Sequence, residues 1–155
     1  MFGQLMKAVI QRVHSASVCV EGSVVGQIQK GLLVYLGVAE QDGPEQISWL
    51  TDKIANLRIF DASLTEKTSK SVQDIAGAVL VISQFTLLAD TRKGRRPSFS
   101  GAARPDRAKG LYEDFVIELG RLVPVETGVF AADMQVESVN DGPFTLLLEH
   151  PMAAI

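Results

Sequence analysis

The stretch MQVESVNDGPFTLLLEH, residues 134–150, contains two strand-like apolar alternations on either side of a turn signal. The letters NDG between two such runs are typical of a β-hairpin, so we predict two strands joined by a turn at residues 140–145. Pro143 is unexpected in an ordinary tight hairpin, because proline has no N–H to resume the ladder and its φ is fixed. The bond before a proline is also where a cis peptide costs least, about 0.5–1 kcal/mol. The motif is therefore either a plain turn or a device that fixes the direction of backbone oxygens.

Several other segments predict strands. The segment GLLVYLGV, residues 31–38, is a continuous apolar run of strand length, which is typical of a strand buried on both faces. The segment SVCVEGSVVGQI predicts a hairpin that turns at Glu21 and Gly22. The segment AGAVLVISQFTLL predicts another buried strand, which ends in polar residues.

Two amphipathic helices accompany these strands. Asp42 is a candidate cap for the first, Pro44 fits its first turn, and a second helix begins near Pro105. Apolar residues recur at steps of three and four along the first helix, at Ile47, Leu50, Ile54 and Leu57. Strands linked mostly by tight turns, together with two helices, predict an α+β fold with a curved, barrel-like, mostly antiparallel sheet.

The totals predict one domain over residues 1–155, with residues 1–5 as a leader or extension before Met6. No apolar run is long enough for a membrane span, and the N-terminal residues lack a secretory signal pattern. The single cysteine, Cys19, has no internal disulfide partner and is expected to be a small buried residue. These features favour a cytoplasmic protein.

The chain has a net charge of −3, yet residues 90–109 are locally basic. The cations of this segment include Lys93, Arg95, Arg96, Arg104, Arg107 and Lys109. A basic patch on an acidic body suits an anionic ligand that approaches from one side. A solvated loop beside a helix explains the charges equally well, and charge alone does not separate the two interpretations.

Several kinds of catalytic site are absent from the sequence. One cysteine and two scattered histidines, His14 and His150, do not make a zinc site, and neither histidine is expected to be catalytic. The sequence contains no G-x-S-x-G elbow and no G-x-x-x-x-G-K-[ST] phosphate loop. We therefore expect no metal and no cofactor.

The segment SQFT, Ser83 to Thr86, places an amide and two hydroxyls at the end of an apolar strand. Hydroxyl and backbone N–H groups at such a place can donate to a developing oxyanion. The alternative is that Gln84 and Thr86 face solvent while Phe85 fills the core, and the segment alone leaves both readings open.

Taken together, the motifs resemble the D-aminoacyl-tRNA deacylase family. They occur in the family's order from Met6 to about His150: MKAVIQRV at 6–13, SQFTL at 83–87, KGRRPSF at 93–99, LYEDF at 111–115, GVFAADM at 128–134 and NDGPFT at 140–145. The same fold is similar to the editing domain of archaeal threonyl-tRNA synthetases. Residues 61–74 lack the expected family pattern, so no prediction is made for them.

The resemblance implies hydrolysis of the ester that joins a D-amino acid to the terminal ribose of tRNA, by a metal-free homodimer with its active site at the subunit interface. It implies that Gly142 and Pro143, joined by a cis bond, enter the partner's site and that Arg12 braces them across the interface. It also implies a substrate-facing strand, Ser83 to Thr86, and an adenosine pocket lined by Phe130 and Met134.

The residues fit this chemistry. Main-chain oxygens of Gly142 and Pro143 can occupy the space that an L side chain would need, so that L-aminoacyl esters are excluded sterically. A D side chain would point outward and make no specific contact. Glycine has no side chain to exclude, so glycyl-tRNA is also expected to be hydrolysed. Either Thr86 is the nucleophile, or backbone N–H groups near Phe85 and Thr86 hold the oxyanion while the substrate 2′-hydroxyl assists water, and the absence of a nearby base favours the second.

Phosphates of the tRNA acceptor stem are the expected ligands of Lys93, Arg95 and Arg96, and Arg104 is a further candidate. The main alternative function is a non-catalytic tRNA- or RNA-binding module, which shares the basic segment but does not need the SQFT and GPFT motifs. A hydrolase of free D-amino-acid esters is a further alternative, and its rate would not depend on the tRNA.

Overall fold

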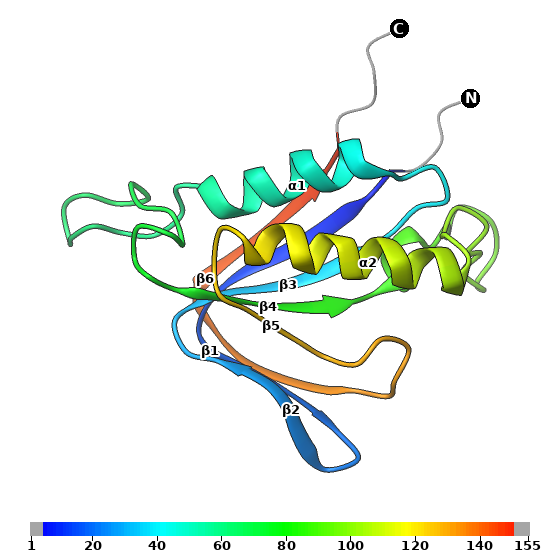
Figure 1. The fold of residues 1–155 in the computed structure, drawn as a ribbon, viewed down its shortest axis with the longest axis horizontal. Helices are drawn as coiled ribbons and strands as arrows, with labels where there is room; N and C mark the ends of the chain where they lie inside the picture. Colours follow the sequence, from blue (N-terminus) through cyan, green and yellow to red (C-terminus); the bar gives the residue numbers. More distant parts are fainter. Residues whose placement is uncertain (1–4, 151–155) are drawn as a thin grey trace, which may run out of the picture.

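The computed structural model describes residues 5–150. The predicted leader, residues 1–5, lies outside the described residues except for Leu5. The elements are β1 (Lys7–Val20), β2 (Ser23–Ile28), β3 (Gly31–Gly37), α1 (Pro44–Asn56), β4 (Ala78–Ser83), the short 3-10 helix η1 (Phe85–Leu88), α2 (Pro105–Gly120), β5 (Val125–Thr127) and β6 (Gln135–Glu149). Figure 1 shows α1 and α2 side by side on one face of the sheet, while the β1–β2 hairpin extends away from them.

Within the described residues the six strands form one sheet, ordered β2-β1-β3-β4-β5, with β6 paired to the other edge of β1. The β1 pairings with β2, β3 and β6 are antiparallel, whereas β3–β4 and β4–β5 are parallel. The α+β, barrel-like class expected from the sequence is confirmed. The parallel pairs were not anticipated, and they explain the helices, because each helix lies in the crossover connection that a parallel pair requires.

Strands β3 and β4 are buried on both faces. Alternate residues of β3 face two apolar clusters: Leu32 and Val34 pack with the helices, while Leu33 packs with Val18 on the other side. Burial on both faces accounts for the uninterrupted apolar letters of residues 31–38, as predicted. The turn predicted at Glu21 and Gly22 is also confirmed, with φ values of 50° and 79°.

The hairpin predicted at residues 140–145 is wrong. Residues on both sides of the motif pair with β1 in one direction, Asn140 with Val13 and Thr145 with Gln11. Residues 141–144 therefore form a bulge opposite Arg12, and β6 continues through it. The 14-residue β1 is long enough to pair both halves, so the glycine and proline mark an irregularity in one strand and not a reversal of the chain.

Both predicted helices are confirmed, but the expected cap of α1 is wrong. The cap position is Gly43, whose N–H donates to Oε1 of Gln46 at 2.8 Å. Asp42 is fully buried instead, and its carboxylate accepts hydrogen bonds from the backbone N–H groups of Met6 and Ala39. Within residues 5–150, no helix is long and apolar enough to cross a membrane. Cys19, expected to be buried, is partly exposed.

Candidate active site

A cavity of about 630 Å³ opens at the carboxyl ends of β3 and β4, beside the first turn of α2. Five of the residues predicted for catalysis and substrate binding line it: Ser83, Gln84, Phe85, Phe130 and Met134. Other lining residues include Tyr35, Phe99, Arg104, Pro105 and Val136. The tertiary structure thus brings the segments 83–85 and 130–134, far apart in sequence, around one space.

The strand that carries Ser83 changes direction at Gln84. The Gln84 N–H still donates to the carbonyl of Leu36 at 2.7 Å, and η1 begins at the next residue. This turn lies close to β3 only because position 37 is glycine. A Cβ at Gly37 would clash with a methyl of Leu88 and would lie 3.2 Å from the carbonyl oxygen of Gln84.

Thr86 lies at the rim of the site. It is exposed and outside the cavity lining, and its Oγ1 accepts a hydrogen bond from Nε2 of Gln84. In the part of the chain that the structure describes, no group accepts a hydrogen bond from the backbone N–H of Phe85 or Thr86. These two donors are therefore free to bind an anionic atom of a ligand.

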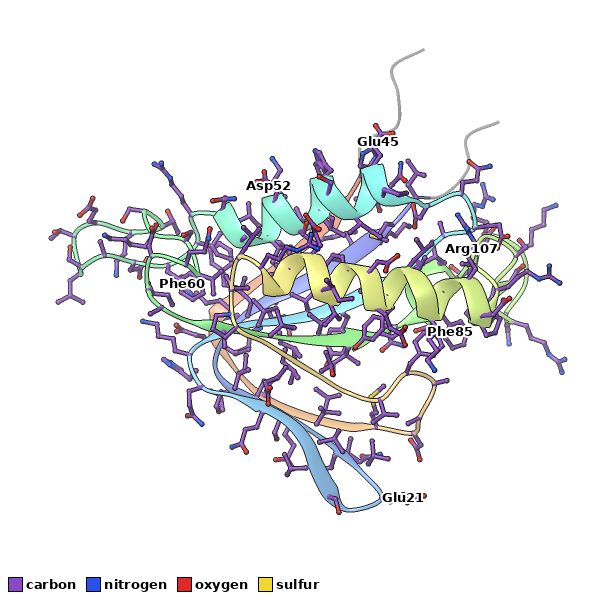
Figure 2. All side chains as sticks on the ribbon, in the orientation of Figure 1. Glu21, Glu45, Asp52, Phe60, Phe85 and Arg107 are labelled. Atoms are coloured by element: carbon purple, nitrogen blue, oxygen red, sulfur yellow. The ribbon has the colours of Figure 1, made fainter. Side chains whose placement is uncertain are left out.

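Phe85 is 54% exposed, although an aromatic side chain usually favours burial. Its ring packs against Phe99 from the basic segment, with centroids 5.1 Å apart. Figure 2 shows Phe85 beneath the N-terminal half of α2. The two rings form an apolar edge of the cavity. Phe85 therefore does not pack into the core, as the alternative interpretation of this segment expected.

Phe130 also forms part of the wall of the cavity. Its ring lies 5.9 Å from that of Tyr112, whose hydroxyl donates to the carbonyl of Val81 at 3.0 Å. Burial raises the pKa of Tyr112 to about 12, so this hydroxyl remains a donor at neutral pH. Tyr112 thus packs against the ring of Phe130 and is itself held to β4 by this hydrogen bond. From the sequence, Tyr112 was indicated only as part of the LYEDF motif at residues 111–115.

Gly142 and Pro143 are exposed and do not line the cavity of their own chain. The peptide bond between them is cis, and Gly142 has φ of +138°, a conformation that residues with a Cβ rarely adopt. Asn140 stabilises the bulge, because its Oδ1 accepts the N–H of Phe144 at 3.0 Å. The structure therefore presents this motif on the surface, outside the cavity of its own chain.

Arg12 braces the bulge from β1. Its Nε donates to the carbonyl of Asp141 at 3.1 Å, and its Nη1 donates to the carbonyl of Ile59 at 2.7 Å. The guanidinium also lies 4.9 Å from the centroid of the Phe144 ring. These contacts are within one chain, so a brace across an interface stays a prediction.

The basic segment forms a closed loop. Asp90 and Ser98 exchange two backbone hydrogen bonds, which place Lys93, Arg95 and Arg96 in the exposed loop between them. The prediction missed Arg92, whose guanidinium and N–H both bind the Asp90 carboxylate. This pairing holds the pKa of Asp90 well below its usual range.

The two arginines at the start of α2 differ in role. Arg104 is exposed and lines the cavity. Arg107 instead donates to the backbone carbonyls of Glu40 and Asp42, so it ties α2 to the segment before α1 (Figure 2). Arg107 is therefore a structural cation.

Neither histidine lines the cavity. His14 is mostly exposed and lies 3.4 Å from Asp141, while the ring of His150 packs edge-on against Trp49. Within residues 5–150, no group of three or more histidine, cysteine or acidic side chains is arranged to hold a metal ion.

Comparisons with known proteins agree with this geometry. A solved structure described as a c-Myc DNA unwinding element binding protein is 39% identical, with a TM-score of 0.89 over 94% of this chain and 99% of that one. A second, described as a probable eukaryotic D-amino acid tRNA deacylase, is 16% identical, with a TM-score of 0.80 over 94% of this chain and 99% of that one, and shows a shared fold. The family model described as D-Tyr-tRNA(Tyr) deacylase matches residues 9–149, nearly the whole described chain. The match covers β1, the cavity and the bulge of β6 together, and from it we conclude that the chain belongs to the D-Tyr-tRNA(Tyr) deacylase family and is an enzyme of the hydrolase class.

Proposed function

We propose that this protein hydrolyses the ester bond of D-aminoacyl-tRNA, releasing the D-amino acid and free tRNA. The observation that carries the proposal is the pair of unpartnered N–H groups, of Phe85 and Thr86, in the segment that borders an apolar cavity in a chain of this family. Such donors can stabilise the tetrahedral oxyanion of ester hydrolysis, and the apolar walls strengthen them by excluding water.

The attacking water is activated by the 2′-hydroxyl of the terminal ribose. Within the described residues, the titratable side chains that line the cavity are Tyr35 and Arg104. Burial raises the pKa of Tyr35, so its phenol stays protonated at neutral pH, and an arginine cannot act as a base. Since Thr86 has no neighbouring base and its hydroxyl accepts from Gln84, substrate assistance is favoured over attack by Thr86.

Handedness is read by main-chain oxygens of Gly142 and Pro143 supplied by a second copy of the chain. Two observations support this proposal: the motif is exposed, and Arg12 and Asn140 hold it rigid outside its own chain's cavity. Main-chain oxygens there would occupy the position of an L side chain and leave a D side chain unread. The active unit is accordingly a homodimer. Glycyl-tRNA, which has no side chain to exclude, is a second substrate.

The tRNA acceptor stem is held through its phosphates by Lys93, Arg95 and Arg96, with Arg104 near the cavity. Their exposure on one closed loop supports this assignment. Phosphate contacts carry no sequence information, which suits an enzyme that acts on many tRNAs. Because charged tRNAs serve translation, we place the protein in the cytoplasm.

The test compares deacylation of D-Tyr-tRNA, L-Tyr-tRNA and Gly-tRNA by the purified chain. We expect hydrolysis of the D ester and the glycyl ester and protection of the L ester. The alternative is a non-catalytic nucleic-acid-binding module. The 39% identical structure is described as a DNA unwinding element binding protein, which agrees with this alternative. That alternative predicts binding of uncharged tRNA or DNA without release of amino acid, so absence of D-tyrosine release would overturn the proposal.

A further inference from the structure

We propose that a groove beside the main cavity binds the cytidine that precedes the terminal adenosine of tRNA. This inference rests on the proposed function, and it takes the terminal adenosine and its ester to occupy the main cavity, which contains Phe130 and Met134, the residues expected to line an adenosine pocket. All tRNAs end in the same CCA sequence, so the nucleotide joined to that adenosine is always a cytidine. A site for it would let the enzyme recognise a feature that all its substrates share.

The groove has a volume of about 410 Å³ and lies between α2 and the segment that follows β5. Its lining residues are Lys109, Tyr112, Glu113, Val116, Ile117, Thr127, Gly128 and Phe130. Phe130 also lines the main cavity, so the groove and the main cavity are adjacent and share one aromatic side chain as their common wall. This continuity is what one strand of consecutive nucleotides requires.

The groove offers surfaces on which a base can stack. The ring of Phe130 is backed by Tyr112, and Tyr112 is held by its hydrogen bond to Val81, so the aromatic wall is fixed before a ligand binds. Ile117 is 57% exposed on the same flank of α2, where it leaves an apolar surface open to solvent. Single-stranded nucleic acids bind proteins through stacking on aromatic side chains of this kind.

Two charged residues of α2 supply polar groups. Glu113 and Lys109 lie one helical turn apart, and their charged atoms are 4.0 Å apart with both side chains more than half exposed. A pair so exposed is weak and is readily exchanged for ligand contacts. The Glu113 carboxylate can accept a hydrogen bond from the N4 amino group of cytosine, and the Lys109 ammonium can contact a backbone phosphate.

This chemistry favours cytosine over uracil. Uracil presents the O4 acceptor where cytosine presents the N4 donor, so uracil would place an oxygen against the carboxylate of Glu113. A neutral glutamine at this position can instead offer its N–H₂ to uracil or its oxygen to cytosine. The Glu113→Gln variant should therefore lose the preference without losing the groove.

The test uses D-Tyr-tRNA ending in CCA and a matched D-Tyr-tRNA ending in CUA, both charged by an RNA catalyst so that synthetase preference plays no part. The measured quantity is kcat/KM for deacylation. With the wild-type enzyme we expect about a tenfold or greater loss for CUA, the size of one hydrogen bond to a charged group. Glu113→Gln should bring the two tRNAs within about twofold of each other, as expected when a neutral amide can pair with either base.

Asp114→Asn is the matched control, because Asp114 is the next residue of α2 and lies in a different groove, between α1 and α2. This variant should keep the wild-type preference for CCA. Lys109→Gln should lower kcat/KM for both tRNAs to the same extent, because a phosphate contact does not read the base.

The outcomes separate this inference from the proposed function. Equal hydrolysis of both tRNAs by the wild-type enzyme, or a preference that persists in Glu113→Gln, would overturn the cytidine site and leave the deacylase activity standing. Failure to hydrolyse either tRNA would overturn the proposed function itself.

Discussion

The Nε of Arg12 on β1 donates to the backbone carbonyl of Asp141 at 3.1 Å, directly beside the glycine-proline motif of β6. The same guanidinium reaches the carbonyl of Ile59 at 2.7 Å through a second nitrogen. One planar side chain thus joins the bulge to the segment that follows α1. This relationship fixes the direction in which Gly142 and Pro143 face.

Replacement of Arg12 should therefore affect both stability and activity. Lysine keeps the charge, but its single ammonium cannot reproduce the two-nitrogen fork. We expect Arg12→Lys to lower the free energy of unfolding by about 1–2 kcal/mol and to lower kcat/KM for D-Tyr-tRNA. Urea unfolding and deacylation kinetics measure the two effects. The control is Arg121→Lys, where the arginine pairs with Glu118 on the surface, and wild-type deacylation in Arg12→Lys would refute the brace.

Thr86→Ala separates the two mechanisms. If the 2′-hydroxyl of the substrate assists water, removal of the Thr86 hydroxyl leaves the backbone N–H groups in place and most of the activity should remain, within about tenfold of wild type. If Thr86 is the nucleophile, activity should be almost abolished. Single-turnover deacylation of D-Tyr-tRNA is the measurement. A D-Tyr-tRNA that carries a 2′-deoxy terminal ribose provides the converse test, since it should resist hydrolysis by the wild-type enzyme.

Gly142→Ala should abolish deacylation and destabilise the bulge. The glycine has φ of +138°, and a Cβ there would lie 3.0 Å from the N–H of Phe144 and 3.3 Å from the guanidinium of Arg12. An L side chain is strained in this conformation, by about 1–3 kcal/mol, so the motif must move. Gly110→Ala is a suitable control, because no atom lies within 4 Å of a Cβ there and the residue is helical. Full activity in Gly142→Ala would contradict the proposed role of the motif.

Exchange of Lys93, Arg95 and Arg96 for glutamine should reduce the salt dependence of tRNA binding. Each phosphate contact contributes a slope of about −0.9 to log K against log salt on a duplex, so the triple variant should flatten the slope by about 2–3. Arg92 is left unchanged because it pairs with Asp90. Lys30→Gln, at an exposed position before β3, should leave the slope as it was. An unchanged slope in the triple variant would exclude this loop as the contact surface.

Asp42→Asn should destabilise the fold, because each of the two oxygens of the buried carboxyl group accepts a backbone N–H, and the N–H₂ of an amide cannot accept one. The expected loss is about 1–3 kcal/mol. Burial raises the pKa of Asp42 above its ordinary value of 3.8. The contribution of this group to the free energy of unfolding is therefore complete below pH 3.8 and is lost as pH rises through the folded-state pKa. Urea unfolding of both proteins from pH 3.5 upward should therefore show a stability difference that narrows with pH.

The sequence predicted those parts of the fold where a short segment decides its own structure. The apolar run at residues 31–38, the turn at Glu21 and Gly22, and the periodic helix that begins at Pro44 were predicted and are present. The role of Asp42 was predicted wrongly, because an aspartate before a helix has the same neighbours in the sequence whether it caps the helix or accepts N–H groups from other segments. Its partner Met6 is far away in the chain.

The site was predictable only in part for the same reason. Five of the residues predicted for catalysis and substrate binding do meet around one cavity, and Phe85, Phe130 and Met134 are among them. Tyr112 and Arg107 bind partners far away in the sequence, so their roles could not be predicted from neighbouring residues. Arg92 differs, because its partner Asp90 lies only two residues away. That pair could have been found from spacing and charge.

The sequence by itself determined the element types, the family motifs and the exposed charge of residues 93–96, because these depend on side-chain periodicity, backbone preference and composition over a few residues. The tertiary structure alone decided that the NDGPFT segment is a bulge in one strand, that β4 runs parallel to β3, and that Phe130 separates two cavities. Those features follow from which strand lies beside which, and strand pairing is set by burial and hydrogen bonding summed over the whole sheet.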